Sequence, residues 1–130
     1  YAQAVSTGFF VLIEDKTGCT NLIASLSGGE KYCLPNDPVI TSVEFESVSD
    51  IKYDKASRMK YINLKLSHEG FKILKTLIGR LPDSKLVLVI DNKVVGIFDR
   101  KGKGLNRIMP IKGDSPNLHW IHDKLQKPKP

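Results

Sequence analysis

Residues 59–90 constrain the fold most, because their hydrophobic pattern changes period twice. Apolar and polar side chains alternate over residues 59–66, which predicts a half-buried strand. Apolar residues then recur at helical spacing, so we predict a helix over residues 67–78. Residues 85–90 are almost continuously apolar, as in a strand buried on both faces. The chain therefore places a helix between two strands of different character.

The ends of this helix carry their own signals. Ser67 is predicted to be the N-cap, since its hydroxyl can accept a hydrogen bond from a free amide of the first turn. Glu69 suits the positive end of the helix dipole. Gly79 is predicted to cap the C-terminal end, and Pro82 prevents any continuation.

Shorter strands are predicted on both sides of residues 59–90. Before it we expect a strand over 8–14, a hairpin of 20–26 and 31–34 about Gly28-Gly29, and one long or broken strand over 39–53 with a solvated face. After it, residues 94–98 return through a tight connection at 91–93. Residues 108–111 form a short strand that Pro110 places at a sheet edge.

A second helix is predicted from Ser115, as its cap, to about Gln126, with Pro116 in the first turn. The order of several strands, a helix, a hairpin and a helix indicates the α+β class. We expect a mainly antiparallel β-sheet with two helices packed on one face.

At 130 residues and 41% hydrophobic composition, the chain suits one domain with one modest core. We assign this domain to residues 5–126 and a flexible basic tail to residues 127–130. No apolar run approaches the roughly 18 residues that span a bilayer. The formal charge is +6, but acidic residues are mixed with basic ones along most of the chain, which favours solubility as its main role.

Two features predict export. Residues 1–4 end in Ala2-Gln3-Ala4, the small-residue pattern of a signal-peptide cleavage region, and we interpret them as its remnant. Cys19 and Cys33 are the only cysteines, and a turn-forming stretch lies between them. A disulfide here closes a loop of about 15 residues and contributes ~3 kcal/mol in the chain-entropy model. Such bonds persist in the periplasm or outside the cell.

Two stretches, 62–70 (INLKLSHEG) and 86–95 (LVLVIDNKVV), resemble the head of the first periplasmic domain of SecD, the accessory subunit of the bacterial protein-export translocon. Ile111-Lys112-Gly113 before the last helix suits the same pattern. Asn92 stands where the family usually has glycine, in a turn that tolerates positive φ. The resemblance covers about residues 39–125. It implies an exported α+β head domain that contacts other proteins and has no active site.

Motifs for catalysis are absent from the sequence. There is no G-x-S-x-G nucleophile elbow, and the glycines near Lys103 lack phosphate-loop spacing. His119 and His122 lie three residues apart, but a zinc site needs further ligands that are not nearby in sequence. We therefore expect no enzyme activity, no cofactor and no metal.

These observations leave protein binding as the expected function. The most concrete form is an immunity or inhibitor protein that neutralises a secreted antibacterial effector. An alternative is a SecD-head-like accessory module that contacts exported or envelope proteins, and a weaker one is binding of anionic lipid or nucleic acid through a basic loop. Nucleic acid is the less favoured partner, and a homodimer stays open.

Two charged clusters and one apolar residue are the candidate partner-binding positions. An acidic stretch suits a cationic partner and a basic loop suits an acidic one. Trp120 is the candidate if neither charged cluster binds, because we expect it to be exposed. The charged candidates are Glu44, Glu46, Asp50 and Asp54 in the acidic stretch, and Arg100, Lys101, Lys103 and Arg107 in the basic loop.

Overall fold

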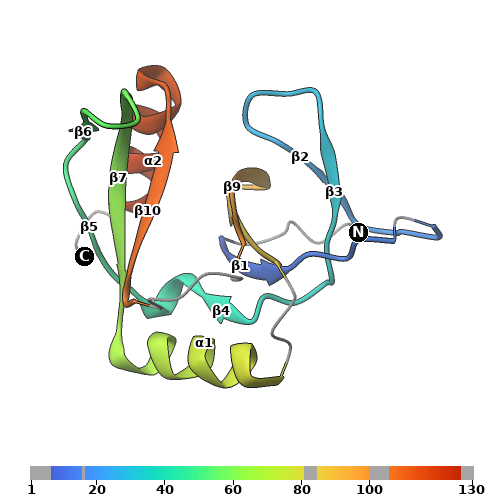
Figure 1. Ribbon diagram of the computed structural model, residues 1–130. Helices are drawn as coiled ribbons and strands as arrows, with labels where there is room; N and C mark the ends of the chain where they lie inside the picture. The colour runs from blue at the N-terminus through green and yellow to red at the C-terminus, as the bar shows by residue number, and fades with distance from the viewer. Residues whose placement is uncertain (1–6, 16, 81–84, 100–105, 127–130) are drawn as a thin grey trace.

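The computed structural model describes residues 7–15, 17–80, 85–99 and 106–126. These residues form two four-stranded antiparallel sheets, a two-stranded hairpin and two α-helices (Figure 1). The α+β class predicted from the order of elements is confirmed. The first sheet has the order β4 (Ile40–Thr41), β1 (Gly8–Val11), β8 (Lys85–Ile90) and β9 (Lys93–Asp99). The hairpin consists of β2 (Leu22–Ala24) and β3 (Lys31–Cys33).

The second sheet is built around β7 (Met59–Leu66), which pairs with β10 (Ile108–Gly113) on one side. On its other side it pairs with β5 (Phe45–Val48) and β6 (Lys52–Asp54) in succession. The predicted long strand over residues 39–53 is thus broken, and a 3-10 turn, η1 (Ser42–Glu44), separates β4 from β5. Pro110 lies in the terminal strand β10, as predicted from its missing amide hydrogen.

Burial follows the alternation predicted for β7. Ile62, Leu64 and Leu66 are buried in the main core, which lies between the two sheets and the helices. The intervening side chains of Tyr61, Asn63 and Lys65 are only partly buried. Helix α2 (Ser115–Leu125) packs on the buried side of this sheet, and α1 (His68–Arg80) contacts both β4 and β7. The second sheet is therefore covered on one face by the described residues.

The first sheet is buried on both faces, which explains the continuous apolar run in β8. Leu86, Leu88 and Ile90 point into the main core, whereas Val87 and Val89 point into a second cluster. This smaller cluster, here called the hairpin core, lies beneath the β2–β3 hairpin. Its buried members are Phe10, Ile23, Leu34, Val87, Val89 and Val94.

The helix ends match the predictions in part. Ser67 caps α1, because its Oγ accepts a hydrogen bond from the amide of Gly70 at 3.0 Å. The prediction for Gly79 is wrong: α1 continues through it to Arg80, and Gly79 does not adopt the positive φ of a helix-terminating glycine. In α2 the cap is Asp114, one residue before the predicted Ser115, and Asp114 accepts from the amide of Asn117.

The turn between β8 and β9 is as tight as predicted. Asp91 and Asn92 have φ values of 53° and 68°, the left-handed conformation of a two-residue hairpin turn. Asparagine tolerates this conformation better than most residues, so a glycine is not required at position 92. None of the helices among the described residues is both long enough and apolar enough to cross a bilayer.

Candidate protein-binding surface

Most residues of the acidic stretch form contacts that stabilise local structure. The Oε1 atom of Glu44 accepts a hydrogen bond of 2.6 Å from Ser67 Oγ, and its backbone carbonyl accepts from the Ser67 amide at 2.8 Å. Asp54 holds the turn before β7, since its carboxylate accepts from the amide of Ala56 and the hydroxyl of Ser57. Asp50 is exposed between β5 and β6, and its backbone carbonyl accepts a hydrogen bond of 2.8 Å from Ser49 Oγ.

Glu46 and Arg107, predicted to lie on separate binding surfaces, are paired with each other. Arg107 Nη2 is 2.9 Å from Glu46 Oε1, and Lys65 Nζ is 3.4 Å from the other carboxylate oxygen. Arg107 Nε also donates to the carbonyl of Leu66 at 3.1 Å. An arginine held in this way has fewer free donors for a partner. The remaining basic candidates, Arg100, Lys101 and Lys103, lie outside the described residues.

Trp120 is not the exposed apolar residue that we expected. It is partly buried against the main core, and Lys124 Nζ lies 5.7 Å from the centre of its ring. His119 is exposed on the same helix, whereas the His122 side chain is only 20% exposed. Within the described part of the chain, no three His, Cys, Asp or Glu side chains come together as a metal site would need.

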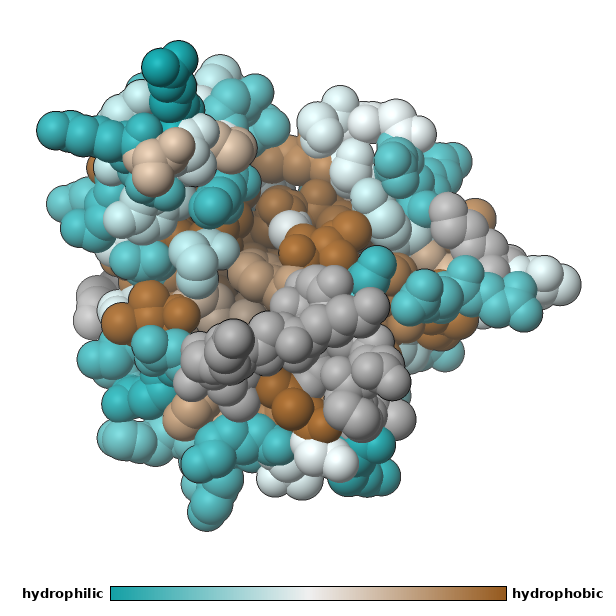
Figure 2. All heavy atoms as spheres, in the orientation of Figure 1, coloured by the Kyte–Doolittle hydropathy of each residue, from teal (hydrophilic) through white to brown (hydrophobic). Residues whose placement is uncertain are grey.

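A groove of about 300 Å³ lies where the two sheets and the hairpin meet. Figure 2 shows apolar surface in the hollow between the part of the molecule that contains β7, β10 and α2 and the part that contains the hairpin. The groove has a mixed lining, with apolar side chains from the hairpin turn and β9 and polar groups from Ser27, Lys112, Asp114 and Asn117. Its lining residues are Leu26, Ser27, Val94, Val95, Lys112, Gly113, Asp114, Asn117 and Ile121.

The walls of this groove come from the terminal strands of both sheets. Strand β9 ends the first sheet and β10 ends the second. The turn of the hairpin is fastened to β9 at one end of the groove, because the Leu26 amide donates to the Val94 carbonyl at 2.9 Å. Further along these two strands, Ile97 and Ile108 are 41% and 42% exposed. These two side chains are not part of the groove lining, which joins the start of β9 to the end of β10.

The sequence did not predict this groove. Its residues come from the first hairpin, β9, the end of β10 and α2 with its cap, so they are far apart in the chain. A weak signal was available in Leu26, a large apolar side chain next to the Ser27-Gly28-Gly29 turn. Such a residue in a solvated turn needs a partner elsewhere in the fold, and here it packs against the main core.

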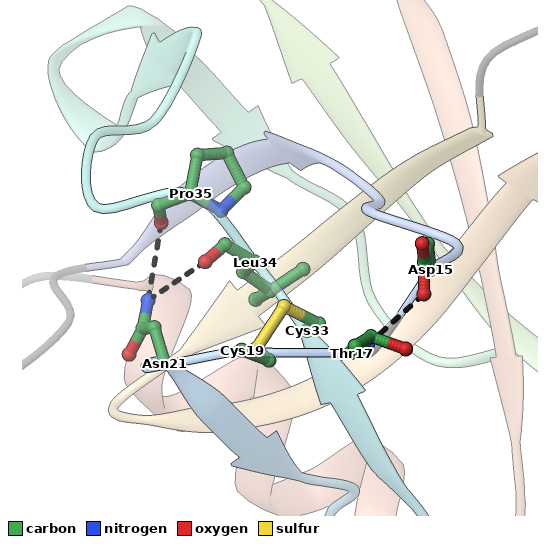
Figure 3. The surroundings of a disulfide bond; sticks show 7 residues. All are labelled: Asp15, Thr17, Cys19, Asn21, Cys33, Leu34 and Pro35. Carbon is green, nitrogen blue, oxygen red and sulfur yellow. Dashed lines mark hydrogen bonds between the residues drawn. A yellow bond between two sulfur atoms is a disulfide. The ribbon is translucent and has the colours of Figure 1, made fainter.

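The disulfide predicted between Cys19 and Cys33 is present (Figure 3). It ties the segment before β2 to the end of β3. Next to it, Asn21 Nδ2 donates to the carbonyls of Leu34 and Pro35 at 3.2 and 3.1 Å. The Thr17 amide donates to Asp15 Oδ1 at 3.0 Å, and this hydrogen bond lowers the pKa of the Asp15 carboxyl.

Solved structures of SecDF resemble this chain. The first is described as a membrane component, SecDF, that enhances protein export: its TM-score is 0.68 at 13% identity, over 95% of this chain and 61% of the SecDF chain. The second is SecDF in a super-membrane-facing form, with a TM-score of 0.64 at 14% identity, over 94% of this chain and 18% of the other.

The sequence comparisons found no match, whereas the structural comparison did. No protein-family model and no curated protein sequence matches the chain. The structural matches span nearly all of it, whereas it spans less than two thirds of the SecDF chains. The SecD-like α+β fold predicted from residues 62–70 and 86–95 is therefore confirmed as the fold of this chain.

Proposed function

We propose that this chain is an extracytoplasmic, non-catalytic module that binds segments of exported proteins, in the manner of a SecD-head-like accessory domain. The observation that carries the proposal is the groove between β9 and β10, whose lining combines apolar and polar groups. Two further observations support it. The fold is that of a protein described as enhancing protein export, and the disulfide suits an oxidising compartment.

The groove fits an extended polypeptide better than a compact ligand. The partly exposed side chains of Leu26 and Val95 offer apolar contacts to such a segment. The adjacent strands are the last in their sheets. Beyond Val94, whose carbonyl accepts from the Leu26 amide, their outer edges present backbone groups that a bound strand can pair with. Binding of this kind depends little on the amino-acid sequence of the bound segment, because most of its hydrogen bonds involve the main chain. It suits a partner that must recognise many unfolded proteins.

The chemistry of the groove agrees with binding rather than catalysis. Among its described lining residues, only Lys112 and Asp114 carry titratable side chains. Asp114 is engaged as the cap of α2, where it accepts the amide of Asn117. A nucleophile with an adjacent general base, which acyl or phosphoryl transfer requires, is not found among these residues.

The test is to measure affinity for a permanently unfolded, reduced and alkylated model polypeptide by fluorescence anisotropy. The variant Ser27→Trp fills the groove from an exposed position in the hairpin turn, so it disturbs folding little. The matched control, Ser47→Trp, makes the same change on β5, at the opposite side of the second sheet from β10. We expect Ser27→Trp to weaken binding at least about tenfold, or 1.4 kcal/mol, and Ser47→Trp to leave it unchanged.

Two results contradict the proposal. One is a wild-type chain that does not bind unfolded polypeptide, and the other is an equal loss in both variants. The inhibitor hypothesis stays a prediction, since no feature of the described surface favours a folded effector. It requires one tight folded partner, which capture from an envelope extract followed by titration of the purified complex identifies.

A further inference from the structure

The second sheet has an open face on the side away from α2, and its side chains form an ordered set. In the register of the sheet, Tyr61 on β7 lies opposite Lys52 on β6 and opposite Lys112 on β10. Directly opposed side chains on one face of an antiparallel pair have Cβ atoms about 5 Å apart. The three therefore form one row, with a lysine on each side of a tyrosine.

The two lysines of this row are free cations. Lys52 and Lys112 are exposed, and neither forms an ion pair within the described chain. Toward the other end of the same face, Glu46 has Lys65 and Arg107 as partners, so two positive charges there share one carboxylate. The open face consequently has an excess of positive charge between Lys65 and the row of Tyr61, whereas Asp54, opposite Met59 in the register, places one carboxylate at the far end.

Apolar side chains lie at both ends of the same face. Met59, at the start of β7, is 41% exposed, and Ile108, which lies opposite Lys65, is 42% exposed. The rows from Met59 to Lys65 extend about 20 Å along the strand. Cationic side chains, a tyrosine and apolar ends in one surface are the combination that suits the boundary between lipid headgroups and acyl chains.

We infer that this open face binds the surface of an anionic lipid bilayer. Lys52 and Lys112 contact headgroup phosphates, while Met59 and Ile108 enter the headgroup boundary. The helices lie on the other side of the sheet, so membrane contact leaves them accessible, whereas the groove at the β10 edge shares Lys112 with the open face. An acidic folded protein fits less well, because it gains little from two apolar groups about 20 Å apart.

The test is co-sedimentation with vesicles of phosphatidylcholine, with and without phosphatidylglycerol, at low and high salt. Each lysine near an anionic surface contributes about fivefold to binding, so Lys52→Gln with Lys112→Gln is expected to weaken it about 30-fold. The matched control, Lys31→Gln with Lys93→Gln, removes the same charge from exposed positions on the hairpin and on β9. It is expected to lower binding less than threefold.

Three outcomes overturn the inference: equal loss in both double variants, equal binding to vesicles without phosphatidylglycerol, or binding to soluble polyglutamate but not to vesicles. The last points to an acidic polypeptide as the partner. None of these measurements involves an unfolded polypeptide ligand. A failure here therefore leaves the proposed groove function standing, and a failure of the groove assay leaves this inference standing.

Discussion

The two sheets differ in how many of their faces are buried. Strand β8, in the first sheet, sends Leu88 into the main core and Val87 into the hairpin core. Strand β7, in the second sheet, sends Leu64 into the main core but leaves Asn63 on the open face. The same number of strands thus produces one enclosed layer and one half-exposed layer.

The difference lies in what covers each sheet. The hairpin covers one face of the first sheet, with a small apolar core beneath it, a disulfide at one end and the Leu26–Val94 hydrogen bond at the other. Among the described residues, no element covers the open face of the second sheet. A sheet that keeps one face free can use that face for contacts, whereas the enclosed sheet contributes only its edge to the groove.

The largest effects are expected from truncating core residues in the two strands. Leu88→Ala and Leu64→Ala should each lower the free energy of unfolding by about 2–5 kcal/mol. The informative pair is Val87→Ala and Asn63→Ala, because these residues occupy the opposite faces of their strands. We expect a loss of about 2 kcal/mol for Val87→Ala and less than about 0.5 kcal/mol for Asn63→Ala in urea denaturation. Equal values for this pair would show that the hairpin does not bury its side of β8.

The disulfide should be the next largest contribution. Replacing Cys19 and Cys33 together by alanine should lower the free energy of unfolding by ~3 kcal/mol, because the unfolded chain regains the entropy of a loop of about 15 residues. The loss should appear as faster amide exchange in β2 and β3 before any change in β7. As a control, reductant should destabilise the wild-type protein and not this double variant. Wild-type stability unaffected by reductant argues against the role assigned to the bond.

The caps of the two helices should make smaller contributions to the free energy of unfolding. Ser67 accepts the Gly70 amide at 3.0 Å and donates to Glu44, whereas Asp114 accepts the Asn117 amide at 3.4 Å. Ser67→Ala should therefore cost about 1 kcal/mol, and Asp114→Ala a smaller amount. Thermal unfolding of the two variants checks the order, and the reverse order contradicts it.

Alkaline pH should act on the hairpin side of the first sheet. Burial raises the pKa of Tyr32 above its ordinary value of 10.0, and the nearby Glu30 carboxylate raises it further. The folded state thus favours the neutral phenol. Its contribution to stability is complete below pH 10.0 and is lost as the pH rises through the folded-state pKa. Tyr32→Phe should remove this part of the alkaline sensitivity, as followed by circular dichroism; an unchanged profile is the opposing result.

The smallest effect is expected on the open face of the second sheet. Lys52→Gln removes an exposed charge without an ion pair, so the free energy of unfolding should change by less than about 0.5 kcal/mol. A larger loss in urea denaturation indicates that this face is covered by another part of the chain. The variant also shows that any change in lipid binding is not a folding defect.

Much of the fold could be predicted from local patterns. The alternation over residues 59–66 and the apolar run over 85–90 correspond to one-sided and two-sided burial. The pairing of Cys19 with Cys33 followed from their number and from the turn between them. The prediction that α1 ends at Gly79 was wrong. An exposed glycine is compatible with a helix interior at a cost of about 1 kcal/mol, which packing of the helix offsets.

The candidate surface was harder to predict from the sequence, because it depends on which strands are neighbours. Glu46 and Arg107 are 61 residues apart and meet only because β5 and β10 flank β7. The groove similarly requires that β9 and β10 end their respective sheets. Composition identified the charged residues correctly but not their use, since Glu44 and Asp54 hold local structure.

The central claim is that unfolded polypeptide binds in the groove between β9 and β10. Amide hydrogen exchange of the full chain, with and without a saturating unfolded polypeptide, tests it most directly. We expect slower exchange at the hairpin turn near Leu26 and along the outer edges of β9 and β10, with β5 and β6 unchanged. Protection confined to β5, β6 or α1, or no protection at all under saturating conditions, would contradict it.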